Sequence, residues 1–151
     1  MNSSVFRHLL YLSLTLGGLT LPEAAEPLAI AKVKGGLVVQ LGADESETAA
    51  QLSRTGRYIV HILDADSAKA EKVRKSLKTD GVYGLAFAET LTDPAHLPYT
   101  ENVVNVVRIN SLGDTPLAEV LRVLTPRGTL LALPGAGLNA AKLKAAGFDS
   151  I

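Results

Sequence analysis

The stretch VVQLGADESETAA, residues 38–50, places a short apolar run before a glycine and then turns acidic. A strand that ends at a glycine and leads into a helix is typical of nucleotide-binding α/β folds, because glycine lets the backbone approach the ligand. A G-x-G-x-x-G series that starts at Gly42 fails, since Asp44 and Glu47 stand at its second and third glycine positions. Asp44 followed three residues later by Glu47 instead predicts a capping box at the start of the next helix.

Strand-like and helix-like segments alternate after this stretch. Apolar runs predict strands at 37–41, 57–64, 82–88, 103–109 and 128–134, and helical spacing predicts helices at 45–56, 65–81, 115–125 and 138–147. Residues 89–102 indicate a loop, and 148–151 the start of another strand. Continuous apolar runs indicate strands that are buried on both faces. The sequence therefore predicts a doubly wound, mostly parallel, Rossmann-like α/β sheet that is truncated at its C-terminal strands.

The first part of the chain has the layout of a secretory leader. A cationic residue precedes the apolar run 9–21, which is short for a membrane span, and small residues follow. We therefore expect a signal peptide over residues 1–25, a linker or short helix over 26–36 and the α/β domain over 37–151. This layout predicts an exported protein, periplasmic or extracellular, with no membrane span after cleavage. Because the expected cleavage point matches the small-x-small pattern poorly, a retained anchoring helix stays open.

Charge and composition disfavour several kinds of partner and site. The chain has 15 basic and 15 acidic residues, so no charge excess favours nucleic acid as a partner. It has no cysteine, which removes disulfides, thiolate metal sites and thiol nucleophiles. The three histidines, His8, His61 and His96, are scattered, and the position of His61 in a predicted strand favours a packed imidazole over a metal ligand. We predict no metal site.

The carboxyl ends of the predicted strands carry the candidate ligand-binding residues. Doubly wound sheets bind ligands outside these ends, where the strand order reverses. Gly42 follows the first strand and Asp64 ends the second. A carboxylate in the position of Asp64 can accept both hydrogens of a ribose cis-diol. Asp64 also precedes a predicted helix, so a helix cap or a surface acid is an alternative.

Two stretches resemble class I S-adenosylmethionine-dependent methyltransferases, in particular their type 11 branch. AEVLRVLTPRGTLLAL (118–133) is similar to the family's E-x-x-R-V-L-K-P-G-G stretch before the fifth strand. DPAHLPYTENVVNVV (93–107) follows the family pattern D-A-E-x-L-P-F-P-D-x-S-F-D-x-V. The resemblance covers about residues 35–151 and implies S-adenosylmethionine as a small-molecule cofactor.

The same resemblance implies roles for six residues. They are Gly42 and Ala43 beside the methionine moiety, Asp64 at the ribose, Asp93 and Pro94 at the adenine, and Asn110 beside the methyl-transfer site. No catalytic residue is implied, because methyl transfer depends mostly on proximity and orientation. Asp93 before Pro94 is also an ordinary turn sequence. We expect Arg122 and Gly128 to be structural, Arg122 near the last carbonyls of a helix and Gly128 in a turn.

Departures from the family pattern lie in the expected cofactor loop and in strand four. Gln40 replaces the usual acid, and Asp44 adds a negative charge where the cofactor's carboxylate would approach. Asn105 stands where strand four commonly has Asp, and PRG (126–128) replaces PGG. Together these departures indicate a degenerate cofactor site.

A closer resemblance is to methyltransferase-like domains that follow a leader and precede a quinoprotein-like β-propeller in exported bacterial proteins. It implies a propeller covalently joined downstream. S-adenosylmethionine is a cytosolic metabolite, so a leader favours a second hypothesis, a non-catalytic binding or structural module of a larger exported protein. A nicotinamide-dependent oxidoreductase ranks third because its glycine series fails at Asp44 and Glu47.

Overall fold

The computed structural model describes residues 33–148 of the chain. The leader expected over 1–25, most of the linker expected over 26–36 and all but the first residue of the last strand segment lie outside the described residues. Within the described part, no helix combines the length and the apolar character needed to cross a bilayer.

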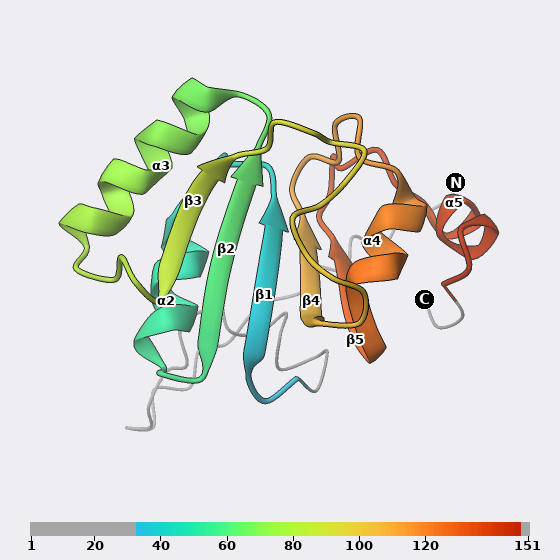
Figure 1. Ribbon diagram of the computed structural model, residues 1–151, viewed down its shortest axis with the longest axis horizontal. Helices are drawn as coiled ribbons and strands as arrows, with labels where there is room; N and C mark the ends of the chain where they lie inside the picture. Colours follow the sequence, from blue (N-terminus) through green and yellow to red (C-terminus); the bar gives the residue numbers. More distant parts are fainter. Residues whose placement is uncertain (1–32, 149–151) are drawn as a thin grey trace, which may run out of the picture.

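One sheet of five parallel strands forms the centre of the molecule, in the order β3-β2-β1-β4-β5 (Figure 1). The strands are β1 (Gly36–Leu41), β2 (Tyr58–Asp64), β3 (Ala86–Thr90), β4 (Val104–Ile109) and β5 (Leu124–Ala132). The chain moves one way along the sheet from β1 to β3 and the other way from β4 to β5, so the strand order reverses between β1 and β4. This arrangement confirms the predicted doubly wound, Rossmann-like α/β fold.

The helices divide between the two faces of the sheet. They are α2 (Glu47–Arg54), α3 (Ser67–Thr79), α4 (Leu117–Val123) and α5 (Ala140–Ala145). Helices α2 and α3 cover one face, α4 covers the other, and α5 lies beyond β5 (Figure 1). Crossovers between parallel strands are right-handed, so connections that step in opposite directions leave their helices on opposite faces.

Each face of the sheet has its own apolar core. The core under α2 and α3 includes Val38, Leu52, Val60, Ile62, Val73, Leu77 and Val106. The core under α4 includes Val39, Leu41, Leu63, Val107, Ile109, Val120 and Val123. Successive residues of β1 enter opposite cores because side chains alternate along a strand. Burial on both faces explains why the strands appear in the sequence as continuous apolar runs.

The third strand begins later than the sequence predicts. The apolar run 82–88 predicts a strand, whereas β3 starts at Ala86. Residues before it form a turn in which the Leu85 amide donates to the Val82 carbonyl at 3.0 Å and Gly84 has a φ of +113°. Backbone in that region favours glycine and interrupts a strand, so the apolar pattern alone overextends the prediction.

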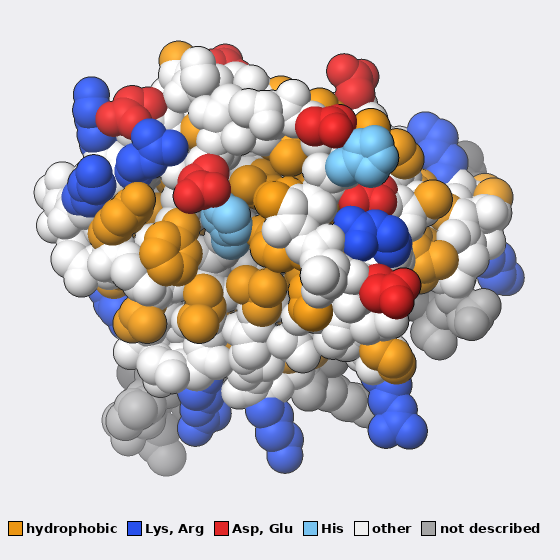
Figure 2. Space-filling view, in the orientation of Figure 1, with side chains coloured by type: hydrophobic (Ala, Val, Ile, Leu, Met, Phe, Trp, Pro, Cys, Tyr) orange, Lys and Arg blue, Asp and Glu red, His pale blue; other side chains and the backbone are white. Residues whose placement is uncertain are grey.

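Within residues 33–148, no helix covers part of the α4 face. The chain returns from β3 to β4 through a helix-free loop, residues 91–103, which crosses the middle of this face (Figure 1). Beyond the loop, Ile59, Tyr83 and Leu85 are 49%, 43% and 47% exposed. Figure 2 shows hydrophobic side chains gathered there over β2 and β3.

His61 fastens this loop to the sheet. Its Nδ1 lies 2.6 Å from the Tyr99 hydroxyl, and its Nε2 lies 3.4 Å from a carboxylate oxygen of Glu89. The imidazole packs edge to face against Phe87 and Tyr99. Burial lowers the pKa of His61, and the nearby Glu89 carboxylate opposes that effect.

Candidate functional site

A small cavity lies at the carboxyl ends of β1, β2 and β4, where the strand order reverses. Its volume is about 130 Å³. Its lining comes from the last residues of β1 and β2, the segments that follow β1 to β4 and the first turn of α3: Leu41, Gly42, Leu63, Asp64, Ala65, Lys69, Leu91, Pro94, Ser111, Leu112, Gly113, Asp114 and Thr115. This is the place at which a doubly wound sheet binds ligands.

Asp64 is held rigidly in the cavity wall. One carboxylate oxygen accepts from the Ala43 amide at 2.7 Å, and the other accepts from the Asp66 amide at 2.8 Å. The helix-cap alternative for Asp64 is wrong, because α3 begins after Asp66, whose side chain accepts from the Ala68 and Lys69 amides. Each oxygen of Asp64 keeps a second lone pair for a ligand.

Gly42 lies where β1 and β4 diverge. Its φ is +97°, and a Cβ atom at this position would lie 2.8 Å from the Ser111 nitrogen. The amides of Asn110 and Ser111 both donate to the Leu41 carbonyl. Any side chain here would therefore force these two strand ends apart. The nearby Asn110 Oδ1 is buried and has no partner among the described residues.

The structure separates the remaining predicted site residues. Pro94 lines the cavity with Gly42 and Asp64, whereas Ala43 is buried in the core under α2 and α3. Asp93 faces away as an exposed turn residue that accepts from the Ala95 amide. Its hydrogen bond with His96 holds the pKa of the Asp93 carboxyl below its usual value. The turn alternative therefore describes Asp93, and only its neighbour Pro94 reaches the cavity.

An ion pair flanks the cavity and was not predicted. Lys69, in the first turn of α3, lies 3.2 Å from an Asp44 carboxylate oxygen, and each side chain is about half exposed. The hydrogen bond from Lys69 to Asp44 raises the pKa of the lysine, and the charge of Asp64 adds to the effect. The sequence pattern does not reveal this contact, because the two residues are 25 positions apart and belong to different elements.

A second, larger cavity, broadly open to solvent, adjoins the first. Its volume is about 640 Å³, and it lies between the segments that follow β4 and β5 and helix α5. Both cavities share a wall formed by Ser111, Leu112 and Gly113. Among residues 33–148 no cluster of three or more potential metal ligands occurs.

Several solved structures share this arrangement. A S-adenosylmethionine-dependent methyltransferase from Aquifex aeolicus matches with a TM-score of 0.66 and 16% identity, over 84% of this chain and 80% of that one. Geranyl diphosphate C-methyltransferase from Streptomyces coelicolor matches with a TM-score of 0.61 and 15% identity, over 72% of this chain and 43% of that one. The cyclase SpnF matches with a TM-score of 0.64 and 18% identity, over 82% and 55%.

The chain has the class I methyltransferase fold. It spans about half the length of several of the solved structures it matches. No protein-family model and no curated protein matches the sequence. At these identities the similarity establishes the fold, and function must be argued from the site.

The two stretches that resemble methyltransferases are in direct contact in this fold. Glu119 in α4 accepts from the Leu97 amide at 2.8 Å, and Arg122 donates to the Tyr99 carbonyl at 2.9 Å. Arg122 Nε also donates to Glu119 at 2.8 Å, and this bond lowers the pKa of the Glu119 carboxyl. Arg122 is structural, as expected, but it binds the loop 91–103 rather than the last carbonyls of its own helix.

The predicted capping box of the methyltransferase-type loop is wrong. Helix α2 begins at Glu47 with Ser46 at its N-cap, so Asp44 lies two residues too early to cap it, and the Ser46 side chain makes no cap bond. The capping acceptor is Glu45, whose carboxylate accepts from the Thr48 amide at 2.9 Å. Asp44 turns away from the helix to Lys69.

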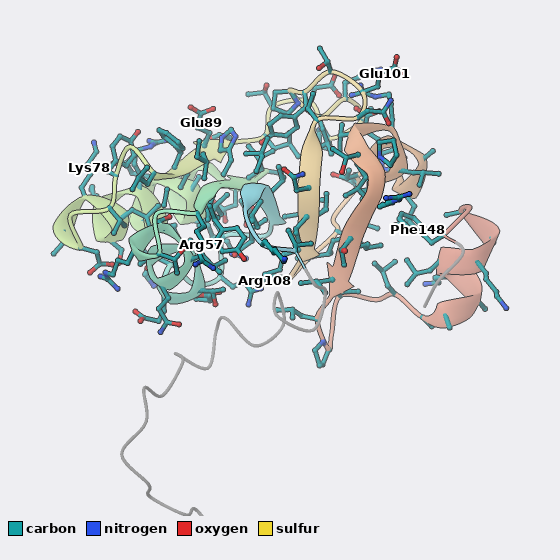
Figure 3. All side chains as sticks on the ribbon, turned by 90° about the horizontal axis from the view of Figure 1, so that it is seen from below. Arg57, Lys78, Glu89, Glu101, Arg108 and Phe148 are labelled. Carbon is teal, nitrogen blue, oxygen red and sulfur yellow. The ribbon has the colours of Figure 1, made fainter. Side chains whose placement is uncertain are left out.

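A buried polar network lies beneath this loop. Gln40 is 1% exposed, donates to the Gly42 carbonyl at 3.0 Å and accepts from Arg108 at 2.7 Å. Arg108 also lies 2.7 Å from Glu45. Figure 3 shows Arg108 on the opposite face of the sheet from Glu89 and Glu101. Gln40 is thus a neutral group that binds both the loop and an arginine from β4.

Two other departures from the family pattern have local structural roles. The Asn105 Oδ1 atom accepts from the Leu37 amide at 2.9 Å and so joins the start of β1 to β4. Arg127 has a φ of +69° at the irregular start of β5, where the β4 partner register jumps from Leu124 to Thr129. The regular pairing of β5 therefore begins near residue 128, where the sequence predicted the strand.

Proposed function

We propose that the smaller cavity binds S-adenosylmethionine through its nucleoside end, as a methyltransferase-type domain with an altered cofactor loop. The observation that carries the proposal is the rigid Asp64 carboxylate beside Gly42 in the cavity wall. A carboxylate fixed at the end of β2 can accept both hydrogens of a ribose cis-diol. The similar solved structures, several of them S-adenosylmethionine-dependent methyltransferases, support the same ligand class.

The residues present fit one end of this ligand better than the other. Asp64, Leu91 and Pro94 offer a diol acceptor and an apolar wall of the kind that a ribose and a base require. On the loop side, the Ala43 amide is already bonded to Asp64, and the carboxylate of Asp44 repels an anion unless Lys69 offsets it. The volume of 130 Å³ is also below the range of about 300 to 1,000 Å³ that is usual for ligand sites. We therefore expect the nucleoside portion to supply most of the affinity.

The chemistry that such a cofactor supplies is a methyl group on a sulfonium. A bound cofactor would supply this methyl group as an electrophile for an acceptor with a free lone pair. The chain's own residues contribute position: Gly42 allows close approach, and Asp64 fixes the ribose.

Calorimetric titration with S-adenosylhomocysteine and with adenosine tests the proposal. Both ligands should bind, with affinities within about tenfold of each other, because the nucleoside end dominates. Asp64→Asn should weaken both by about tenfold or more, since a charge-assisted bond to the ribose is lost. Asp80→Asn, an acid outside the cavity, should leave both unchanged. The proposal fails if neither ligand binds at millimolar concentration, or if Asp64→Asn binds as well as the parent chain.

A non-catalytic module of a larger exported protein is the second candidate function. The observation that favours it is the network of Gln40, Arg108 and Glu45, which secures the loop without any ligand. The cyclase SpnF matches this chain in fold, and its name describes a different activity. If neither ligand binds in the titration and the chain still unfolds cooperatively, this candidate is favoured, because the fold then persists without the cofactor.

A further inference from the structure

The larger cavity has the size of a ligand site and is not occupied by the cofactor proposed above. Its volume of about 640 Å³ lies within the range of about 300 to 1,000 Å³ that is usual for small-molecule pockets. Its walls are Ser111–Gly113 after β4, Gly135–Leu138 after β5, Leu117 of α4 and one side of α5.

Small and apolar residues dominate these walls. Leu112, Leu117 and Leu138 supply the larger apolar surfaces. Gly135 and Gly137 have φ values of +92° and +73°, and a Cβ atom at either position would meet nothing within 4 Å. The two glycines therefore leave open space in the wall instead of filling it with side chains.

One charge faces this apolar space. Among residues 33–148, Lys142 of α5 is the single charged residue that lines this cavity, and no acid of that range lines it. Its ammonium donates to the Gly137 carbonyl at 2.9 Å, which holds it at the wall and leaves two further hydrogens for a ligand. Lys142 has no carboxylate partner among the ion pairs of the described residues.

We propose that the larger cavity binds a small apolar molecule that carries one anionic group, with the anion at Lys142 and the apolar body against the three leucines. An anion gains a charge-assisted hydrogen bond from the ammonium, and the apolar body gains by leaving water. A cationic molecule of the same shape is repelled by Lys142.

The shared wall gives this ligand a place in the proposed reaction. Ser111, Leu112 and Gly113 separate the two cavities, so a molecule in the larger one lies next to a cofactor in the smaller one. The role of methyl acceptor rests on the proposed function. Binding of the apolar anion does not, because Lys142 and the leucines need no cofactor to form the pocket.

Nuclear magnetic resonance titration of the ¹⁵N-labelled 151-residue chain tests the inference with three probes of one shape: 4-phenylbutyrate, 4-phenylbutanol and 4-phenylbutylamine. We expect 4-phenylbutyrate to shift the amide signals of Gly113, Gly135 and Gly137 and to bind at least tenfold more tightly than the alcohol, with the amine weakest. Lys142→Gln should abolish the preference for the carboxylate. Lys144→Gln, which removes an equal charge from the same helix outside the lining, should retain it.

A second variant separates loss of the pocket from loss of the fold. Ala146→Phe places a ring in the cavity and should block all three probes while the remaining signals stay dispersed. The inference is overturned if the probes bind with equal affinity, if Lys142→Gln keeps the preference, or if the shifts cluster at the exposed apolar residues Ile59 and Leu85. Failure of S-adenosylhomocysteine to bind would remove the acceptor role and leave these outcomes unaffected.

Discussion

Arg127 occupies a backbone conformation that favours glycine. Its φ of +69° places it in the left-handed region, which costs a residue with a side chain about 1–2 kcal/mol. Replacement by glycine removes that cost but adds about 0.5–1 kcal/mol of entropy to be lost on folding. We therefore expect Arg127→Gly to raise the free energy of unfolding by up to about 1 kcal/mol, measured by urea denaturation.

A matched control for this change is Arg54→Gly in α2. The chemical change is the same, but Arg54 is helical, so glycine should lower the free energy of unfolding by about 1 kcal/mol. Opposite signs for the two variants would show that backbone conformation decides the effect. Equal losses would contradict the prediction and point to the arginine side chain instead.

The Glu45 carboxyl makes stability depend on pH. Burial raises its pKa, but the hydrogen bond from the Thr48 amide and the contact with Arg108 outweigh burial, so the pKa lies below its ordinary value. Because its pKa is lowered in the folded chain, the Glu45 carboxyl stabilises the fold at pH values above its ordinary pKa. This stability is lost as the pH falls through the lowered pKa. At pH 7 we expect Glu45→Gln to cost about 1–2 kcal/mol.

Urea denaturation from pH 7 to pH 3 measures this dependence. The gap between the parent chain and Glu45→Gln should narrow as pH falls, because protonation removes the same charge that the substitution removes. Glu47→Gln, on the exposed side of α2, should stay within about 0.5 kcal/mol of the parent chain at pH 7. A gap that widens toward pH 3 would contradict the assigned direction of the shift.

At the scale of elements, the sequence predicts the strands better than the contacts between them. Buried runs such as that of β1 can be predicted because both faces of the strand are apolar, and the alternation of strands and helices gives the fold class. The start of β3 is misplaced because Val82 and Tyr83 are apolar but belong to a turn. Local polarity does not distinguish an apolar turn from a strand.

In the candidate site too, positions set by single elements could be predicted better than contacts between elements. Gly42 and Asp64 could be found because they lie at the carboxyl ends of strands, which meet at one edge of the sheet. Pro94 was implied only by the resemblance to methyltransferases. Lys69 could not be found, since its place in the cavity wall depends on where α3 begins. The capping acceptor of α2 is Glu45 and not the predicted Asp44, because capping patterns predict a helix start only to within a residue or two.

The contact between the two methyltransferase-like stretches explains why they occur together. Glu119 and Arg122 replace the missing helix of the β3–β4 connection by binding its backbone at Leu97 and Tyr99. Buried carbonyls and amides of a loop need such partners. In this chain the two stretches are therefore one structural unit, which positions Pro94 at the cavity.

At the scale of the whole molecule, stability is unevenly distributed. The central strands are buried on both faces, whereas α5 has no buried residue and is six residues long. Short helices gain their stability from tertiary packing, so α5 has little to hold it. We expect local opening of α5 at a free energy of about 1–2 kcal/mol, while amides of β1 such as that of Val39 exchange only through global unfolding.

Native-state hydrogen exchange measures both values in one experiment. The amides of Leu143 and Lys144 should exchange within seconds to minutes, and that of Val39 over a far longer time. Addition of 4-phenylbutyrate should slow the α5 amides selectively, because a ligand that binds only the closed form stabilises it by RT ln(1 + [L]/Kd). Protection of α5 equal to that of β1 without ligand would contradict the prediction. The larger cavity would then be rigid in the free chain, and ligand binding would not order α5 any further.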